Sequence, residues 1–100
     1  MTSKERAFLK KKAHILDPIV RIGKDGLNDG IIKSINDAIE SRELIKVKIL
    51  QNCEQDREEI YFKLNEIEDF EVVGITGRII TIYKENDKNP KIKLEMINLK

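Results

Sequence analysis

The sequence predicts an α/β fold, a two-layer sandwich in which helices pack on a mixed four-stranded sheet. Segments with the helical period of apolar residues alternate with short β-branched segments, and the order of elements is α-β-α-β-α-β-β. The last two strands are separated only by a tight turn, which predicts a hairpin. With 100 residues, 40% hydrophobic and 37% charged, the chain suits one domain and is too apolar to be disordered.

The first helix is expected near the N-terminus, where Thr2 and Glu5 have the spacing of a capping box. Apolar residues then recur on one helical face: Leu9, Ala13 and Leu16. Pro18 ends this helix, because the residue before a proline disfavours helical dihedral angles. A short β-branched strand is predicted at residues 19–22.

A second helix is expected after a glycine-containing turn, with Asn28 or Asp29 as its cap. Its buried stripe is predicted to be Ile31, Ile32, Ile35, Ala38 and Ile39. Residues 43–50 then alternate, so that positions 45, 47 and 49 face one way while Lys46 and Lys48 face the other. One face of the sheet is therefore expected to be open to water at this strand.

A third helix is predicted from Asp56 to about residue 69, followed by strands at residues 70–75 and 78–83. Its apolar seam is Ile60, Leu64 and Ile67. Weak alternation of Ile92, Leu94 and Met96 predicts an extended tail. We place no domain boundary: residues 1–100 form a single domain, with its core at about residues 3–84 and a C-terminal tail at 85–100.

Charge is distributed unevenly, although the net charge is only +1. Residues 1–25 carry seven basic and three acidic residues, residues 51–75 carry two and eight, and residues 76–100 carry six and three. Folding could place a basic side opposite an acidic side, and the basic side would then attract a polyanion. The alternative is that these charges are only a solvated surface.

Several classes of protein find no support in the composition. No apolar segment approaches the roughly 20 residues that span a membrane, and the N-terminus lacks the apolar stretch of a signal peptide. Cys53 is the only cysteine, so no intramolecular disulfide can form. We expect a cytoplasmic protein that does not bind membranes.

The turn between the first strand and the second helix is the most informative segment. It has the pattern G-x-x-G, formed by Gly23, Lys24, Asp25 and Gly26. Glycines let backbone amides approach a ligand, a following helix N-terminus favours phosphate, and Lys24 can reach a phosphate oxygen. G-x-x-G loops clamp nucleic-acid backbone in KH domains. The alternative is a plain turn, which Asp25 favours because its carboxylate would repel phosphate.

Catalytic and metal chemistry is poorly supported. The loop lacks the G-x-G-x-x-G pattern of dinucleotide sites, the Lys-Ser/Thr pair of nucleotide hydrolases and the ligand spacing of an EF-hand. His14 has no second histidine or paired cysteine beside it. The acidic residues at 54–71 fall mostly on a predicted helix, without a strand-borne aspartate pair for a metal. We therefore expect no catalytic activity, no metal and no cofactor.

Basic residues surround the loop in sequence. The first helix carries Lys10, Lys11 and Lys12, while Arg21 and Lys24 follow it. If this helix lies beside the loop, these groups form one surface that contacts phosphates. Aromatic residues for stacking bases are scarce, so recognition of backbone and shape is expected.

Three segments carry a resemblance to a known family: residues 9–27 (LKKKAHILDPIVRIGKDGL), 43–48 (ELIKVK) and 73–84 (VGITGRIITIYK). Over about residues 3–84 the chain resembles the CRM domain (chloroplast RNA splicing and ribosome maturation) in its bacterial single-domain YhbY form. The resemblance implies a fold similar to the C-terminal domain of a bacterial translation initiation factor. It also implies RNA binding through the G-x-x-G loop and association with precursors of the large ribosomal subunit. In this resemblance, Lys10 and His14 match family positions on the first helix. Arg78 and Lys84 match basic positions on and just after the last strand.

We therefore predict a monomeric RNA-binding protein without enzymatic activity that assists assembly of the large ribosomal subunit, with large-subunit ribosomal RNA or its precursor as partner. The expected RNA-contacting residues are Gly23, Lys24, Asp25, Gly26, Lys10, Lys11, Lys12, His14, Arg21, Arg78 and Lys84. One alternative is a protein-interaction module that docks its acidic third helix on a basic partner. Another is a hydrolase that uses His14 and nearby acids.

Overall fold

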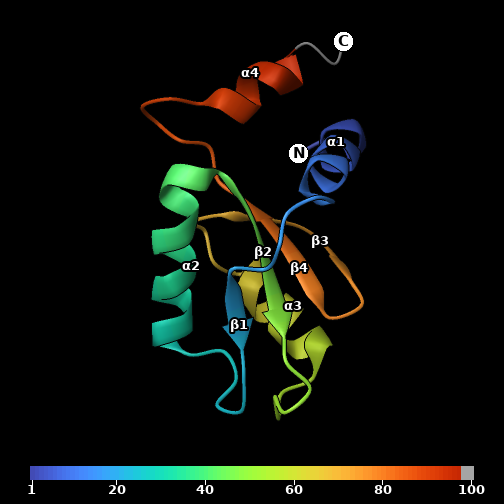
Figure 1. Cartoon of the computed structure of the whole chain (residues 1–100), viewed down its shortest axis with the longest axis vertical. Coiled ribbons are helices and arrows are strands. Elements are labelled where there is room, and N and C mark those ends of the chain that lie inside the picture. The colour runs from blue at the N-terminus through green and yellow to red at the C-terminus, as the bar shows by residue number, and fades with distance from the viewer. Residues whose placement is uncertain (98–100) are drawn as a thin grey trace.

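The computed structural model describes residues 1–97, and within this range it contains four helices and a four-stranded sheet (Figure 1). The helices are α1 (Ser3–Ala13), α2 (Asp29–Arg42), α3 (Arg57–Asn65) and α4 (Lys91–Ile97). The strands are β1 (Val20–Ile22), β2 (Leu44–Ile49), β3 (Glu71–Thr76) and β4 (Ile79–Tyr83). The first seven elements follow the predicted order, so the predicted α/β fold is confirmed.

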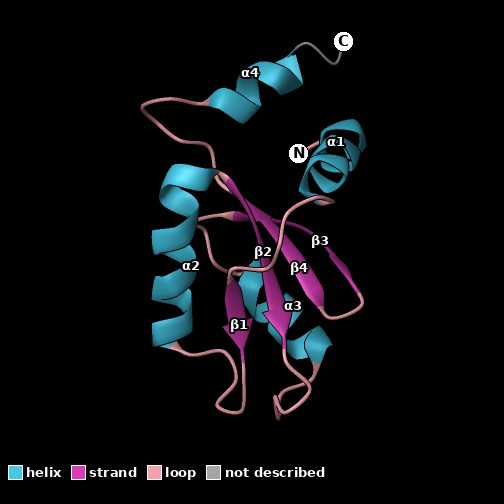
Figure 2. Ribbon diagram, in the orientation of Figure 1, coloured by secondary structure: helices cyan, strands magenta, loops and turns pink. Residues whose placement is uncertain are grey.

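The sheet is mixed, with the strand order β1-β2-β4-β3 (Figure 2). β1 runs parallel to β2, whereas β4 is antiparallel to both β2 and β3. The parallel pair is connected through α2, as a crossover between parallel strands requires. β3 and β4 form the predicted hairpin, and their register shifts between Val72 and Gly74.

The main core lies on the sheet face that α2 and α3 cover. Every second side chain of β2 points to these helices, because side chains alternate along a strand. The fully buried residues of this core are Ile22, Ile35, Ile39, Ile45, Val47, Ile49, Ile60, Leu64, Ile80 and Ile82. The central residues of the stripe predicted for α2 and of the seam predicted for α3 are among them.

A second, smaller core lies on the opposite face, at one end of the sheet. Its buried residues are Leu9, Ala13, Leu44, Val73, Tyr83 and Ile92. α1 and α4 therefore cover only this end, and the rest of the face is left without a helix (Figure 1).

Two of the helices begin at the caps predicted from the sequence. The Thr2 N–H donates to Glu5 Oε1 at 2.9 Å and the Glu5 N–H donates to Thr2 Oγ1 at 3.1 Å, which completes the capping box. At α2, Asn28 Oδ1 accepts from the Ile31 N–H at 3.0 Å. These caps satisfy amides that the first turn of a helix leaves free.

Three boundaries differ from the predictions. α1 ends at Ala13, before Leu16 and Pro18, because the amides of His14 and Leu16 donate to carbonyls only three residues back. The tail is not extended over residues 91–97, where it forms α4, while residues 98–100 of the predicted tail lie outside the described residues. The spacing of four between Ile92 and Met96 fits both periods: it places them on one face of a helix and also on one face of a strand. α3 ends at Asn65 because the amides of Glu66 and Ile67 donate to carbonyls only three residues back, which tightens the last turn.

Candidate nucleic-acid interface

The sheet face opposite α2 and α3 is basic where no helix covers it. Arg21 of β1 and Lys46 and Lys48 of β2 point to this side, because their neighbours along each strand are buried in the main core. We call these three residues the basic sheet face. Arg21 pairs directly with Lys48 across two strands, whose spacing is roughly 4.8 Å.

The charges of the basic sheet face are not offset by ion pairs in the part of the chain that the structure describes. Like charges that lie opposite each other on a sheet destabilise it. Within residues 1–97, neither Arg21 nor Lys48 nor Lys46 forms an ion pair with an acidic side chain. This unfavourable placement is typical of a surface that receives an anionic partner.

At the α1 end, the basic sheet face continues into a hollow of about 180 Å³. We call it the α1 hollow, and its lining residues are Lys10, His14, Lys46, Thr76, Ile79 and Thr81. Lys46 Nζ donates to the backbone oxygen of His14 at 3.3 Å, which ties β2 to the C-terminal end of α1. No carboxylate lines the hollow, so its charge is positive.

The G-x-x-G loop is a hydrogen-bonded turn in which Gly26 has a structural task. The Gly26 N–H donates to the Gly23 oxygen at 3.0 Å, and Gly26 has a φ of 70°. Gln55 lies against it, since Gln55 Oε1 accepts from the Leu27 N–H at 2.7 Å. A Cβ at position 26 would lie 2.7 Å from Gln55 Cδ. Both the backbone conformation and the space therefore require glycine here.

Gly23 is different, because the fold does not need its missing side chain. A Cβ at position 23 would lie 3.8 Å from Leu50 Cδ1 and 3.9 Å from Asn52 Oδ1, which are ordinary contacts. Lys24 and Asp25 at the loop tip are exposed, and within residues 1–97 neither forms an ion pair. Gly23 and Lys24 thus form an accessible end to the surface.

The N-terminus of α2 offers less to an anion than the sequence suggests. One of its free amides, that of Ile31, is already satisfied by Asn28. Asp29 adds a carboxylate in the first turn. The loop itself and Lys24, more than the helix end, remain available for phosphate.

The expectation that the first helix lies beside the G-x-x-G loop is wrong. α1 lies near the end of the molecule where α4 is found, whereas the loop between β1 and α2 lies at the other end (Figure 1). The helix is held there because Leu9 and Ala13 pack in the second core. The predicted basic residues are therefore connected only through the basic sheet face, which runs from the α1 hollow to Gly23.

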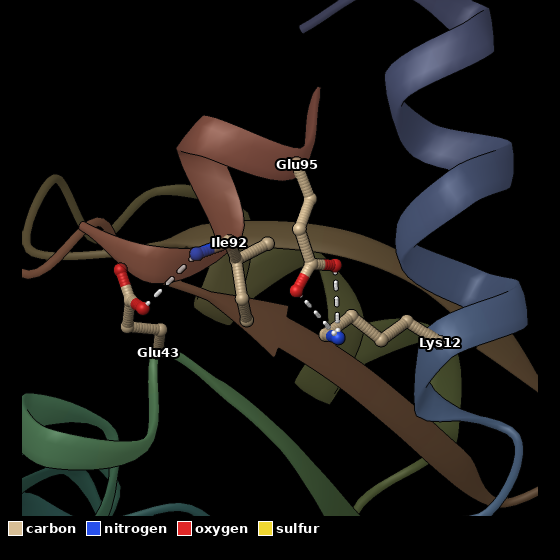
Figure 3. Close-up of polar contacts among 4 residues, drawn as sticks. All are labelled: Lys12, Glu43, Ile92 and Glu95. Carbon is tan, nitrogen blue, oxygen red and sulfur yellow. Dashed lines mark hydrogen bonds and ion pairs between the residues drawn. The ribbon is translucent and has the colours of Figure 1, made fainter. Parts of the chain in front are cut away.

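Three predicted residues lie outside the basic sheet face and the α1 hollow. Lys12 points toward α4, where its Nζ lies 3.0 Å from Glu95 Oε2 (Figure 3). Lys84 follows β4 at the same end of the molecule, and its N–H donates to the Glu43 oxygen at 2.8 Å. Lys11 is exposed on α1 but does not line the α1 hollow.

Arg78 lies at the opposite end of β4 and is partly engaged. Its Nε donates to the Ile49 oxygen at 2.9 Å and its Nη2 donates to the Leu50 oxygen at 2.7 Å. The guanidinium thus fixes the end of β2 and the segment next to the G-x-x-G loop. Its position supports a structural task for Arg78 at the loop end of the face.

The fold adds four residues to the site that are not among the expected RNA-contacting residues: Lys46, Lys48, Thr76 and Thr81. Lys46 and Lys48 could have been found from the alternation in residues 43–50, which placed them on the open face. Thr76 and Thr81 carry no such signal, because their place in the hollow depends on how β3 pairs with β4 and on where α1 packs.

The surface has no aromatic platform for bases. Phe70 and Tyr83 are buried, and Phe8 and Tyr61 are half-buried against the two cores. Phe62 is 67% exposed but belongs to α3, on the other side of the sheet. Single-stranded binding by stacking needs exposed aromatic rings, so charge and shape are what this face offers.

Two further properties bear on the class of site. Within residues 1–97, no helix is long and apolar enough to cross a membrane. Over the same residues, no group of three or more His, Cys, Asp or Glu side chains is placed to hold a metal ion.

Comparison with known proteins identifies relatives over nearly the whole length of the chain. It is 45% identical to the Bacillus subtilis protein named "Probable RNA-binding protein YqeI", over 94% of this chain and 98% of the relative. It is 35% identical to "Probable RNA-binding protein MJ0652" of Methanocaldococcus jannaschii, over 95% and 77%. A Haemophilus influenzae relative named "RNA-binding protein" is 31% identical, over 94% of each.

The fold and a family description agree with these relatives. The solution structure of SAV1595 from Staphylococcus aureus superposes with a TM-score of 0.75 at 43% identity, covering 91% of this chain and 95% of that one. The CRS1 / YhbY (CRM) domain matches residues 1–84, which include every element up to β4. The chain therefore belongs to the CRS1/YhbY (CRM) domain family.

Proposed function

We propose that this chain binds RNA with the basic sheet face, the α1 hollow and the end of the G-x-x-G loop formed by half-buried Gly23 and exposed Lys24. The observation that carries the proposal is that Arg21 and Lys48 lie opposite each other without an acidic partner. Three relatives whose names describe RNA-binding proteins support the choice of RNA over other polyanions.

The RNA is recognised through its backbone. Phosphate contacts position a protein on nucleic acid, whereas reading single-stranded sequence requires stacked bases. Because the face offers Lys, Arg and Thr side chains and no exposed ring, the RNA partner is structured, with its phosphates on one surface. Large-subunit ribosomal RNA or its precursor fits this description, and the resemblance of residues 9–27 and 73–84 to the YhbY form supports it.

In the cell, the chain acts as a cytoplasmic assembly factor of the large ribosomal subunit, as a monomer and without catalysis. Crosslinking the protein in cells and sequencing the attached RNA tests this role. Enrichment of large-subunit ribosomal RNA over other transcripts is the expected result. Crosslinks spread over transcripts in proportion to their abundance would overturn it.

Removal of the basic sheet face tests the RNA-binding surface itself. The triple substitution Arg21→Ala, Lys46→Ala and Lys48→Ala is expected to lower affinity for a ribosomal RNA fragment. It should also reduce the slope of log K against log salt by about three, since each phosphate contact contributes about one. Titrations at several salt concentrations measure both quantities. An unchanged slope would show that RNA binds elsewhere.

The alternative of a protein-docking α3 is weakened by pairing within the helix. Arg57 Nε lies 3.0 Å from Glu58 Oε1, and Lys63 Nζ lies 3.3 Å from Glu59 Oε1. These pairs neutralise two of the acids that a basic partner would need. A pull-down tests this alternative. If ribosomal proteins still bound after RNase treatment, and substitution of Glu58 and Glu59 abolished that binding, protein docking would be favoured instead.

A further inference from the structure

We propose that the α1 hollow is a seat for one phosphate group of the RNA backbone and that Gly74 is the residue that positions Lys10 over it. This inference rests on the proposed RNA binding and goes further by assigning one ligand group to one set of side chains. It also assigns a role to Gly74, a glycine of β3 that does not belong to the G-x-x-G loop.

Gly74 is buried in β3, at the register shift that follows Val72. Its φ is not in the left-handed region, so the backbone conformation does not require glycine. A glycine inside a strand weakens the strand, and it often marks a place where another group approaches closely. The approaching group is the side chain of Lys10.

The Lys10 side chain fills the space that a Cβ at position 74 would take. Such a Cβ would lie 2.6 Å from Lys10 Cε and 3.1 Å from Lys10 Nζ. Lys10 therefore lies flat across β3, and its ammonium group ends beside the Gly74–Thr81 pair. Any larger residue at position 74 would lift the lysine away from the sheet.

The groups that meet Lys10 in the hollow suit an anion. Lys46 is held in place by its bond to the His14 oxygen, and Thr81 lines the hollow although it is only 9% exposed. Ammonium groups and threonine hydroxyls are donors to phosphate oxygens. A threonine in the lining of a cationic hollow can donate its hydroxyl to a ligand that accepts hydrogen bonds.

The size of the hollow restricts the ligand. Its volume of about 180 Å³ is below the roughly 300 Å³ at which pockets for small molecules begin. The hollow can therefore take a group such as phosphate but not a whole nucleotide. This matches one phosphate of a chain that continues along the basic sheet face.

A double-mutant cycle tests the link between the glycine and the lysine. Lys10→Ala is expected to lower affinity for a ribosomal RNA hairpin about tenfold and to reduce the salt slope by about one. Gly74→Ala should cause a similar loss in the otherwise unchanged protein. In the Lys10→Ala background, Gly74→Ala should have no further effect, because the displaced group is absent. Additive losses would overturn the positioning role.

Two controls keep the cycle interpretable. Lys91→Ala removes the same charge from an exposed position on α4 and should leave the affinity within about twofold, because isolated surface charges contribute little. Chemical denaturation of each variant reports whether the fold is kept. If Gly74→Ala alone is unstable, the comparison of Lys10→Ala with Thr81→Val still tests the seat, since both remove a donor from the hollow.

Inorganic phosphate separates this inference from the proposed function. NMR titration with phosphate is expected to shift the backbone amide signals of Thr76 and Thr81, and Lys10→Ala should abolish the shifts. If the protein failed to bind RNA but showed these shifts, the seat would stand and the proposed function would fail. If RNA bound while phosphate left the signals unchanged and Lys10→Ala kept full affinity, the seat would be wrong and RNA binding would stand.

Discussion

Two glycines of the same short motif have different physical tasks in this molecule. Gly26 has a positive φ, and its α-carbon faces Gln55, so any side chain there is strained by the backbone and crowded by a neighbour. Gly23 has neither constraint. Gly26 is therefore required by the fold, whereas the fold does not require glycine at position 23, which can be tested for a role in ligand binding.

Alanine at each position should separate stability from binding. Gly26→Ala is expected to lower the free energy of unfolding by about 1–3 kcal/mol, because it combines positive-φ strain with displacement of Gln55. Gly23→Ala should leave stability nearly unchanged and weaken RNA binding, because a methyl group would stand between the loop backbone and the phosphate chain. Urea denaturation and RNA titration of both variants measure the two effects. Equal losses of stability would contradict this assignment.

The sequence was enough to locate this loop but not to show that its two glycines have different roles. The spacing of Gly23 and Gly26 between a strand and a helix is local information. The neighbour that makes Gly26 indispensable is Gln55, whose side chain accepts from the Leu27 N–H although the two residues are 28 positions apart in the chain. Its contact depends on the packing of the segment after β2, and no local pattern announces it.

At the level of elements, α4 closes the second core through a buried glutamate. Glu43 is 3% exposed and ends α2 with a φ of 65°. Its carboxylate accepts from the Asn86 N–H at 2.9 Å. It also accepts from the Ile92 N–H at 3.3 Å (Figure 3). These bonds fix the approach to α4 and its first turn, so that Ile92 is buried. The strained glutamate thus pairs backbone groups that would otherwise be buried alone.

The pKa of Tyr83 measures how well the second core is closed. Burial raises the pKa of Tyr83 to about 12, and the nearby carboxylates of Glu43 and Glu85 act in the same direction. In a Tyr61→Phe variant Tyr83 is the only tyrosine. Its absorbance change should occur near pH 12, and truncation after residue 84 should move it down toward 10. Titration near pH 10 in the full chain would contradict the burial of this ring.

The same shift sets a window of pH sensitivity. The unfolded chain releases the Tyr83 proton near its ordinary pKa of 10.0, whereas the folded chain keeps it until about 12. The contribution to stability is therefore complete below pH 10 and is lost as the pH rises to about 12. A Tyr83→Phe variant should lose stability less steeply over this interval.

For the molecule as a whole, the open face of the sheet is cationic, whereas α3 on the other side carries balanced charge, with Arg57 and Lys63 beside Glu58 and Glu59. Arg21, Lys46 and Lys48 lie on the open face, while α3 and its acidic residues lie on the other side (Figure 1). The order of elements was predictable because each helix and strand has its own period. The distance between α1 and the loop was not, because it depends on Leu9 and Ala13 packing in the second core.

Changes on the two sides should therefore have unequal effects on RNA binding. Glu58→Gln together with Glu59→Gln should alter affinity by less than about twofold at physiological salt. These residues lie across the sheet and its helix layer, farther from the RNA than the screening length of about 8 Å. Substitution of Lys46 and Lys48 should lower affinity strongly under the same conditions. Parallel titrations compare the two pairs, and equal effects would refute a one-sided interface.

The register shift between Val72 and Gly74 has a consequence for how molecules of this protein meet one another. β3 is an edge strand, and a regular edge presents a row of free amides and carbonyls that a second copy can extend into an aggregate. A bulge breaks this row and twists the strand. The glycine that makes room for Lys10 thus lies where the edge is least suited to recruit a neighbouring chain, so the irregularity disfavours aggregation through β3.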